Sequence, residues 1–272
     1  MGEPGTGGLV RILVTNDDGV DAPALVPLAR AMAQLGEVTV VVPDRERSWV
    51  GKAITRFEPV AVKEMERGGL PIYAVSGYPA DAVQLGIHAF ANPIPDLVVS
   101  GINLGYNHGA GFLMSSGTVG AAVEAWISGV SAVAVSTGTM TDWHVWRDLA
   151  MAAESEPTWT RLAETTVELV TRVRAAGLSA HADVISINMP FESTADTPRR
   201  VTTIARMGYD RLFAYRGEGR YVHEYGGGMT EFEAVDGSDV DAAHDGVISI
   251  TPIRLPTAAV VPAEIRTAIE RG

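Results

Sequence analysis

The chain has 272 residues, of which 46% are hydrophobic and 20% are charged, and its formal net charge is −12. Such a length suits one large α/β domain or two small ones, and the absence of cysteine excludes disulfides, zinc–thiolate sites and thiol nucleophiles. It also fits a reducing compartment, so we expect a cytoplasmic protein. The acidic balance disfavours nucleic-acid polymers and membranes as partners, although a small anionic substrate can bind where the site supplies a cation.

Residues 9 to 190 alternate between strand-like and helix-like patterns, after a Gly-rich stretch, residues 1–8, that we expect to be a flexible tail and not a signal peptide. Continuous apolar runs predict strands at 9–14, 38–43, 71–75, 96–100, 131–137 and 183–190. Apolar residues at helical spacing predict helices at 22–36, 79–90, 117–129 and about 157–176. No apolar run approaches the length of a bilayer span. The alternation predicts an α/β fold with a mostly parallel sheet covered by helices on both faces.

The pattern changes after residue 190. Residues 191–246 are rich in Gly, Tyr, Arg and Asp and contain short alternating stretches, which predict β-hairpins projecting from the core. A strand at 246–253 and a helix at 262–270 follow. We therefore expect a core at 9–190 and a hairpin-rich region at 191–272 that completes the same domain.

Polar residues gather where the predicted strands end. Asp17 and Asp18 follow the first strand, a charged loop (43–48) follows the second, and small polar residues follow the strands at 96–100 and 131–137. The carboxyl ends of parallel strands share one edge of a sheet, where ligands bind in open α/β folds. Two adjacent carboxylates repel each other, and a divalent cation relieves that repulsion. Hard oxygen donors favour Mg²⁺, Mn²⁺ or Ca²⁺, whereas the alternative for Asp17 and Asp18 alone is a capped turn.

The stretch SSGTVGAA, residues 115 to 122, opens a predicted helix with small residues. A helix start of this kind presents backbone N–H groups and favours an anion such as phosphate, although such a stretch can also be a simple helix cap. The nearest histidine, His108, is not expected to be a ligand. Neither a G-x-G-x-x-G fingerprint nor a Walker A lysine occurs, which disfavours dinucleotide binding and P-loop NTPase chemistry.

These motifs together resemble those of the SurE family, the stationary-phase survival protein nucleotidases. The matching stretches run in order along nearly the whole chain: Asn16–Gly19, Pro43–Ser48, Ser100–Asn107, Ser116–Ala122 and Ser249–Pro252. Each stretch is short, but the series in this order is specific. The resemblance implies a Rossmann-like fold whose C-terminal region, swapped or projecting, builds a homodimer or homotetramer.

The resemblance also implies a phosphatase that requires one divalent metal ion, Mg²⁺ or Mn²⁺, and acts on nucleoside 5′- and 3′-monophosphates. The family's metal ligands correspond to Asp17, Asp18, Ser48 and Asn103. The expected phosphate-binding set is Asn16, Asn107, Ser116, Gly117 and Thr118. Asp17 and Asp18 are the catalytic candidates, and the sequence leaves open whether one of them deprotonates water or attacks phosphorus.

Three stretches depart from the family pattern. Residues 49–53 contain Trp49 and Lys52 where the family usually carries small polar residues, and residues 108–115 lack the family's acidic residue and tyrosine. Late in the chain, TEFEAV has Glu231 where the family has an aspartate, and extra residues follow it. These departures concern the pocket wall and the oligomer arm, and they leave two alternatives. One is a related phosphatase that acts on a non-nucleotide or secondary-metabolite phosphate ester, and the other is a non-catalytic nucleotide-binding protein.

Overall fold

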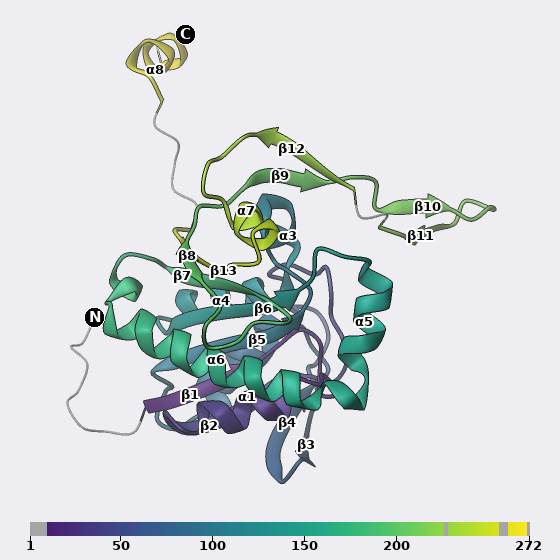
Figure 1. Ribbon diagram of the computed structural model, residues 1–272, viewed down its shortest axis with the longest axis vertical. Helices are drawn as coiled ribbons and strands as arrows, with labels where there is room; N and C mark the ends of the chain where they lie inside the picture. Colours follow the sequence, from purple (N-terminus) through teal and green to yellow (C-terminus); the bar gives the residue numbers. More distant parts are fainter. Residues whose placement is uncertain (1–9, 226–227, 256–260, 271–272) are drawn as a thin grey trace.

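A nine-stranded mixed sheet forms the centre of the protein (Figure 1). The computed structural model describes residues 10–225, 228–255 and 261–270, so the predicted tail at 1–8 lies outside the described residues. The strands of this sheet are β1 (Val10–Thr15), β2 (Gly36–Pro43), β3 (Val62–Arg67), β4 (Leu70–Val75), β5 (Leu97–Leu104), β6 (Ser131–Gly138), β7 (Val184–Pro190), β8 (Arg199–Val201) and β13 (Ile248–Ile253). Their order is β3-β4-β2-β1-β5-β6-β7-β13-β8, and only the pairs β3–β4 and β13–β7 are antiparallel.

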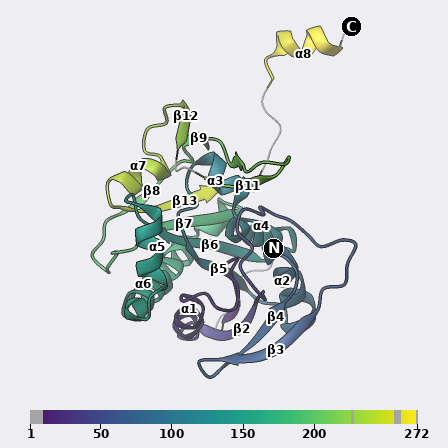
Figure 2. The same cartoon turned by 90° about the vertical axis from the view of Figure 1, so that its right-hand side faces the viewer.

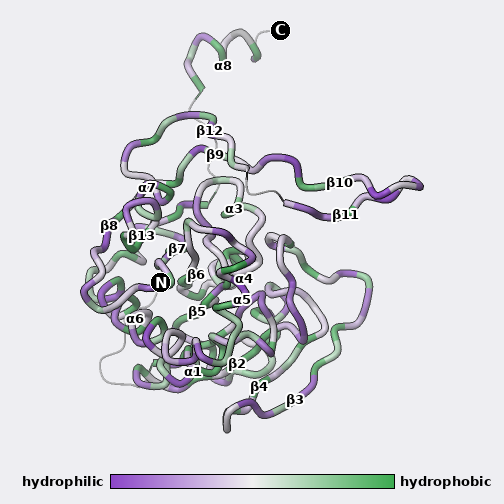
Figure 3. Tube along the Cα trace, turned by 45° about the vertical axis from the view of Figure 1, so that its right-hand side comes forward, coloured by the Kyte–Doolittle hydropathy of each residue, from purple (hydrophilic) through white to green (hydrophobic). Residues whose placement is uncertain are grey.

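Helices cover both faces of the sheet (Figure 2). On one face α1 (Leu25–Met32) and α6 (Glu156–Ala175) pack against alternate strand residues such as Ile12 and Val14. On the other face α2 (Pro79–Leu85) and α4 (Gly117–Ile127) pack against Leu13. Because both faces are buried, the central strands contain long apolar stretches, which are green in Figure 3, and their buried polar residues, such as Asn103, Ser136 and Asn188, lie near their carboxyl ends. The predicted α/β fold with a mostly parallel sheet is confirmed.

The centre of the sheet contains a topological switch point. From β1 the chain first builds β2 and β4 on one side, and it then returns to build β5, β6 and β7 on the other side. In doubly wound sheets the crevice for ligands lies beyond the carboxyl ends of the two strands at such a point. Here these strands are β1 and β5. The turn that carries Asp18 follows β1, and the loop after Leu104 follows β5.

Smaller elements complete the chain. Two antiparallel pairs, β9 (Arg206–Tyr209) with β12 (Met229–Glu233) and β10 (Phe213–Tyr215) with β11 (Tyr221–His223), form the predicted hairpin-rich region, and β10–β11 projects as an arm (Figure 1). The remaining helical elements are α3 (Gly109–Ser115), α5 (Trp143–Met151), α7 (Asp239–His244), α8 (Ala263–Glu270), a π-helical turn at Gly86–Phe90 and two 3₁₀ turns at Ala153–Ser155 and Leu178–Ala180. Within the described ranges, none of the helices combines the length and the apolar character that a membrane crossing requires.

Several predicted boundaries differ from the structure. The helix expected at 22–36 ends at Met32, and Gly36 begins β2. A Cβ atom at Gly36 would lie 1.7 Å from the carbonyl oxygen of Val10, so a glycine is required for this close approach of the two strands. The strand expected at 96–100 continues to Leu104 through an irregularity in its pairing with β6. The elements β3, α3, α5 and α7 were not predicted.

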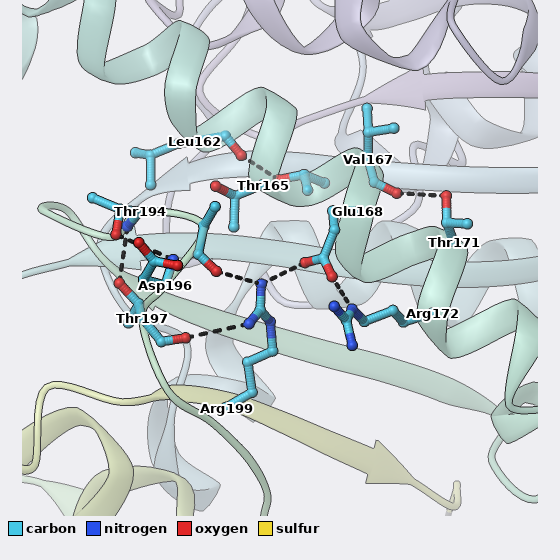
Figure 4. A network of polar contacts seen from close by, with 12 residues as sticks. Leu162, Thr165, Val167, Glu168, Thr171, Arg172, Thr194, Asp196, Thr197 and Arg199 are labelled. Carbon is cyan, nitrogen blue, oxygen red and sulfur yellow. Dashed lines mark hydrogen bonds and ion pairs between the residues drawn. The ribbon is translucent and has the colours of Figure 1, made fainter.

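An ionic network joins α6 to the segment that leads into β8 (Figure 4). The guanidinium of Arg199 donates to Glu168 Oε2 at 2.6 Å and to the carbonyl oxygen of Ala195 at 3.1 Å. Glu168 also pairs with Arg172 one helical turn further along α6. The network therefore ties the beginning of the C-terminal region to the core of the fold.

Candidate active site

The turn after β1 is shaped by Asn16 and Gly19. The side-chain amide of Asn16 donates to the carbonyl oxygen of Gly19 at 3.1 Å, and its oxygen accepts the Gly19 N–H at 3.0 Å. Gly19 has a φ of 85°, and a Cβ atom there would lie 2.5 Å from the carbonyl carbon of Arg45. This turn bends the chain so that Asp17 and Asp18 both face the neighbouring loops.

Asp17 lies where the loop after β2 meets the start of α4. The hydroxyl of Thr118 donates to Asp17 Oδ1 at 2.6 Å, and the backbone N–H of Arg47 donates to the Asp17 carbonyl oxygen at 2.7 Å. A Cβ atom at Gly117 would be only 2.8 Å from Asp17 Oδ2, so this position requires a residue without a side chain. The side chain of Asp17 thus joins two segments that are far apart in the sequence.

Asp18 contacts the end of β5. Its Oδ2 accepts the backbone N–H of Leu104 at 2.9 Å. The preceding residue, Asn103, is 8% exposed and donates its amide N–H to the carbonyl oxygen of Gly105 at 2.6 Å. That hydrogen bond fixes the amide nitrogen of Asn103, and it leaves the amide oxygen as the end of the side chain that can bind a cation.

Ser48 lies in the loop that contacts Asp17. Its hydroxyl donates to Glu46 Oε1 at 2.6 Å, and the other carboxylate oxygen of Glu46 lies 3.7 Å from a guanidinium nitrogen of Arg147. Arg147 belongs to α5, which packs beside the site through Trp143 against Gly105. Sequence patterns do not indicate this cation, because α5 is not among the predicted elements.

The predicted phosphate-binding residues Asn107 and Ser116 lie in two different segments, the loop after β5 and the start of α4. Asn107 is 6% exposed, donates its backbone N–H to Asn188 Oδ1 at 2.8 Å, and donates its side-chain amide to Ser136 Oγ at 2.8 Å. Ser116 is the N-cap of α4, where its hydroxyl accepts the N–H of Val119 at 3.1 Å. Sequence analysis missed Asn188, whose position becomes meaningful only once β6 and β7 are paired.

Comparison with known proteins identifies the family of the chain. The family model described as "Survival protein SurE" matches residues 12–212. The chain belongs to the SurE family. The predicted resemblance is therefore confirmed.

Individual relatives of this SurE chain match along most of its length. A protein named "5'-nucleotidase SurE" from Methanocella arvoryzae is 37% identical over 252 residues, which is 92% of this chain and 93% of the relative. Another of the same name from Syntrophotalea carbinolica is 39% identical, covering 90% of this chain and 91% of the relative. The crystal structure of the SurE protein from Aquifex aeolicus superposes with a TM-score of 0.72 at 27% identity, covering 96% and 99% of the two chains.

The two carboxylates of this SurE chain carry a strong electrostatic penalty. Burial raises the pKa of Asp17 to about 6, although the Thr118 hydroxyl acts in the opposite direction by stabilising the carboxylate. Burial and then the charge of Asp17 raise the pKa of Asp18 well above its usual value. Among the described residues, no lysine or arginine forms an ion pair with either carboxylate; the charge of Arg147 lowers the pKa of Asp18, but it acts against the larger effects of burial and of the Asp17 charge.

The donor set fits a hard divalent cation. Two carboxylates, one hydroxyl and one amide oxygen come from the ends of β1, β2 and β5, which the contacts of Asp17 and Asp18 bring together. In the part of the chain that the structure describes, no group of three or more His, Cys, Asp or Glu side chains is placed to hold a metal ion. A soft or imidazole-preferring metal therefore has no set of ligands there, whereas Mg²⁺ and Mn²⁺ accept neutral oxygens.

In the absence of metal, the unfolding free energy of the wild type should fall relative to that of the Asp17→Asn protein as pH rises. The raised pKa means that the folded wild type holds its proton more tightly than the unfolded chain does, so this stabilisation is full at low pH and disappears as pH rises through about 6. Relative to Asp17→Asn, the wild type should lose up to about 1.4 kcal/mol per pH unit between the unfolded and folded pKa values. Urea unfolding in EDTA across this range measures it, and a difference independent of pH would contradict it.

Proposed function

We propose that this chain is a divalent-metal-dependent phosphomonoesterase that hydrolyses nucleoside 5′- and 3′-monophosphates to nucleoside and phosphate. The observation that carries the proposal is the hydrogen bond of Thr118 to Asp17, because it places the start of α4 directly beside the carboxylate pair at the switch point. A metal site next to a helix N-terminus is a recurrent way to bind a phosphoryl group. The relatives named 5'-nucleotidase SurE support the hydrolysis of nucleoside 5′-monophosphates.

The proposed ligands of the metal, Mg²⁺ or Mn²⁺, are Asp17, Asp18, Ser48 and Asn103. When bound, the cation supplies Lewis-acid polarisation of the phosphoryl oxygens. The protein prepares these ligands by hydrogen bonds from its own donors: Thr118 to Asp17, and the Leu104 N–H to Asp18. These bonds hold the carboxylates in place before substrate arrives, which is the arrangement that favours electrostatic stabilisation.

The phosphate would lie between Asn107 and the first residues of α4. Asn107 is oriented by Asn188 and Ser136, and Gly117 brings the helix start close to Asp17. Ser116 and Thr118 keep the helix start in place through the cap and the Asp17 contact. We assign Asn16 to shaping the turn, since both polar atoms of its side chain bind the Gly19 backbone. Arg147 supplies the cationic charge that an acidic protein needs near an anionic substrate.

The reaction is a displacement at phosphorus. A water oxygen forms a new bond to phosphorus, the bond from phosphorus to the ester oxygen breaks, and a proton passes to the leaving alkoxide so that nucleoside and inorganic phosphate result. Asp17 and Asp18 are the carboxylates that can accept the proton of the water. Direct attack by an aspartate, followed by hydrolysis of the phosphoenzyme, gives the same products.

A phosphate-release assay tests the proposal. The purified chain is incubated with 5′-AMP, 5′-GMP, 3′-AMP and p-nitrophenyl phosphate in Mn²⁺ or Mg²⁺, and parallel samples contain EDTA. We expect release with metal, none after EDTA treatment, and recovery when excess Mn²⁺ is added. Release that persists in EDTA would contradict the metal requirement. Nucleotide binding without release under all conditions would identify a non-catalytic binding protein instead.

We also infer that the protein is a homodimer or homotetramer held by its C-terminal region. The β10–β11 arm projects from the body in Figure 1, and its residues Phe213, Tyr215 and Tyr221 are each more than half exposed. A two-stranded hairpin of this length is at best marginally stable alone in water. A second copy of the chain would bury these rings and support the arm.

A further inference from the structure

Five aromatic rings gather beside the loop that carries Ser48. The ring of Trp49 lies 5.1 Å from those of Tyr209 and His223 and 5.7 Å from those of Phe112 and Tyr225, measured between centroids. Phe112 lies a further 5.8 Å from Tyr209 and 5.6 Å from Tyr225. We call these five residues the aromatic cluster. They come from the loop after β2, from α3, from β9 and from the chain at and beyond β11, so tertiary structure alone brings them together.

The aromatic cluster is not part of the buried core. None of its members is buried: Trp49, Phe112, Tyr209 and Tyr225 are partly exposed, and His223 is exposed. The four neighbours meet the indole of Trp49 at interplanar angles between 56° and 75°. Among the described residues, none of the four neighbouring rings stacks parallel to the indole of Trp49, so such a contact is left for a ligand.

The backbone fixes Trp49 in an unusual position. Its φ is 61°, in the left-handed region that bulky residues rarely adopt. Such strain persists where the surrounding structure over-determines it, and it is frequent at functional sites. Here four neighbouring rings contact the indole. The next residues of the loop contact α4.

The contacts with α4 are independent of the aromatic cluster. The ammonium of Lys52 lies 2.5 Å from Glu124 Oε2, and this carboxylate is almost completely buried in α4. A Cβ atom at Gly120 would lie 2.3 Å from the carbonyl oxygen of Gly51, so the loop rests directly on the helix. Removing the Trp49 ring should therefore leave the loop, with Ser48, in place.

The cluster borders the proposed phosphate site. Trp49 directly follows Ser48 in the chain, and the backbone N–H of Gly51 donates to the carbonyl oxygen of Ser115 at 2.8 Å, one residue before Ser116. Phe112 lies on α3, one helical turn before Ser116. A phosphate at the start of α4 would thus place the rest of the substrate next to these rings.

We propose that Trp49, held in place by the other rings of the aromatic cluster, stacks on a flat aromatic group in the alcohol portion of the substrate. The proposal rests on the proposed phosphomonoesterase function and refines its substrate class to phosphate esters of nucleosides and of aryl alcohols. Stacking on an aromatic side chain is tolerant of base identity, so purine and pyrimidine nucleotides are both accepted. Binding energy from this non-reacting part of the substrate contributes to kcat/KM.

The test compares substrates with and without a flat group. For the wild type and for Trp49→Ala, kcat/KM is measured in Mn²⁺ with 5′-AMP and with ribose 5-phosphate, which lacks the base. We expect the wild type to prefer AMP and the ratio of the two kcat/KM values to fall by about 5- to 150-fold in Trp49→Ala. An unchanged ratio, or a wild type without preference for AMP, would overturn the proposal. A structural role alone would lower both values together and leave the ratio as it was.

Two further variants and a binding measurement complete the test. Trp49→Phe keeps a flat ring and should keep most of the preference for AMP. Phe57→Ala removes an aromatic ring that is 87% exposed and outside the cluster. It should leave kcat/KM unchanged for both AMP and ribose 5-phosphate. AMP, but not ribose 5-phosphate, should quench the tryptophan fluorescence of the wild type, and this quenching should disappear in Trp49→Phe. If the wild type releases no phosphate, the proposed function fails, but this quenching still decides whether Trp49 stacks on a base.

Discussion

The Asp18→Asn enzyme should lose at least about 100-fold in kcat for phosphate release and remain folded. Asparagine keeps an oxygen that can accept the backbone N–H of Leu104, which Asp18 binds at 2.9 Å, so the connection to β5 survives. The substitution removes one of two negative charges that the proposed cation requires. Loss of the Asp18 charge next to Asp17 should also make the metal-free protein more stable at neutral pH, because burial and the charge of Asp17 both disfavour the ionised form of Asp18.

A neighbouring carboxylate provides the control for Asp18→Asn. Asp21 lies three residues further on, is well exposed and pairs with Arg67, and it takes no part in the proposed site. The Asp21→Asn enzyme should retain wild-type kcat. Circular dichroism and urea unfolding establish that both variants are folded. Undiminished turnover by folded Asp18→Asn protein would remove Asp18 from the catalytic machinery.

The fold was largely predictable because its central strands are buried on both faces. Continuous apolar runs such as residues 38–43 and 131–137 correspond to β2 and β6, and the helices between them follow ordinary 3.6-residue spacing. The edge strand β3, with the sequence VKEMER, is mostly exposed and gives no such signal. The end of β5 was also missed, because its pairing with β6 is irregular between Ser100 and Asn103 and no local pattern marks its continuation.

The candidate site was predictable only in part. The sequence located its polar residues at strand ends, and the carboxyl ends of parallel strands necessarily share an edge. It could not reveal which donors would meet each carboxylate, since Thr118 is 101 residues from Asp17. Arg147 lies on the unpredicted α5, and the partners of Trp49 on β9 and β11 are more than a hundred residues away. Sequence patterns thus indicated where polar side chains gather, but not which residues of α5, β9 and β11 surround them.

The Gly19→Ala protein should lose about 2–4 kcal/mol of unfolding free energy, and its kcat/KM should fall by more than about 10-fold. Gly19 has a φ of 85°, and a Cβ atom there would lie 2.5 Å from the carbonyl carbon of Arg45 and 2.8 Å from its Cα. Backbone atoms cannot rotate away as a side chain can. The loop after β2, which carries Ser48, would therefore have to move relative to Asp17 and Asp18, and the proposed metal ligands would separate.

A second glycine separates the effect of backbone strain from the effect of this contact. Gly129, after the end of α4, has a φ of 80°, but a Cβ atom there would have no neighbour within 4 Å. Gly129→Ala should cost only the strain of a left-handed alanine, about 1–2 kcal/mol, and should leave kcat/KM unchanged. Urea unfolding and phosphate release are measured for both variants. If Gly19→Ala loses no more stability than Gly129→Ala and remains fully active, close packing of the β1 turn against the β2 loop is not what assembles the site.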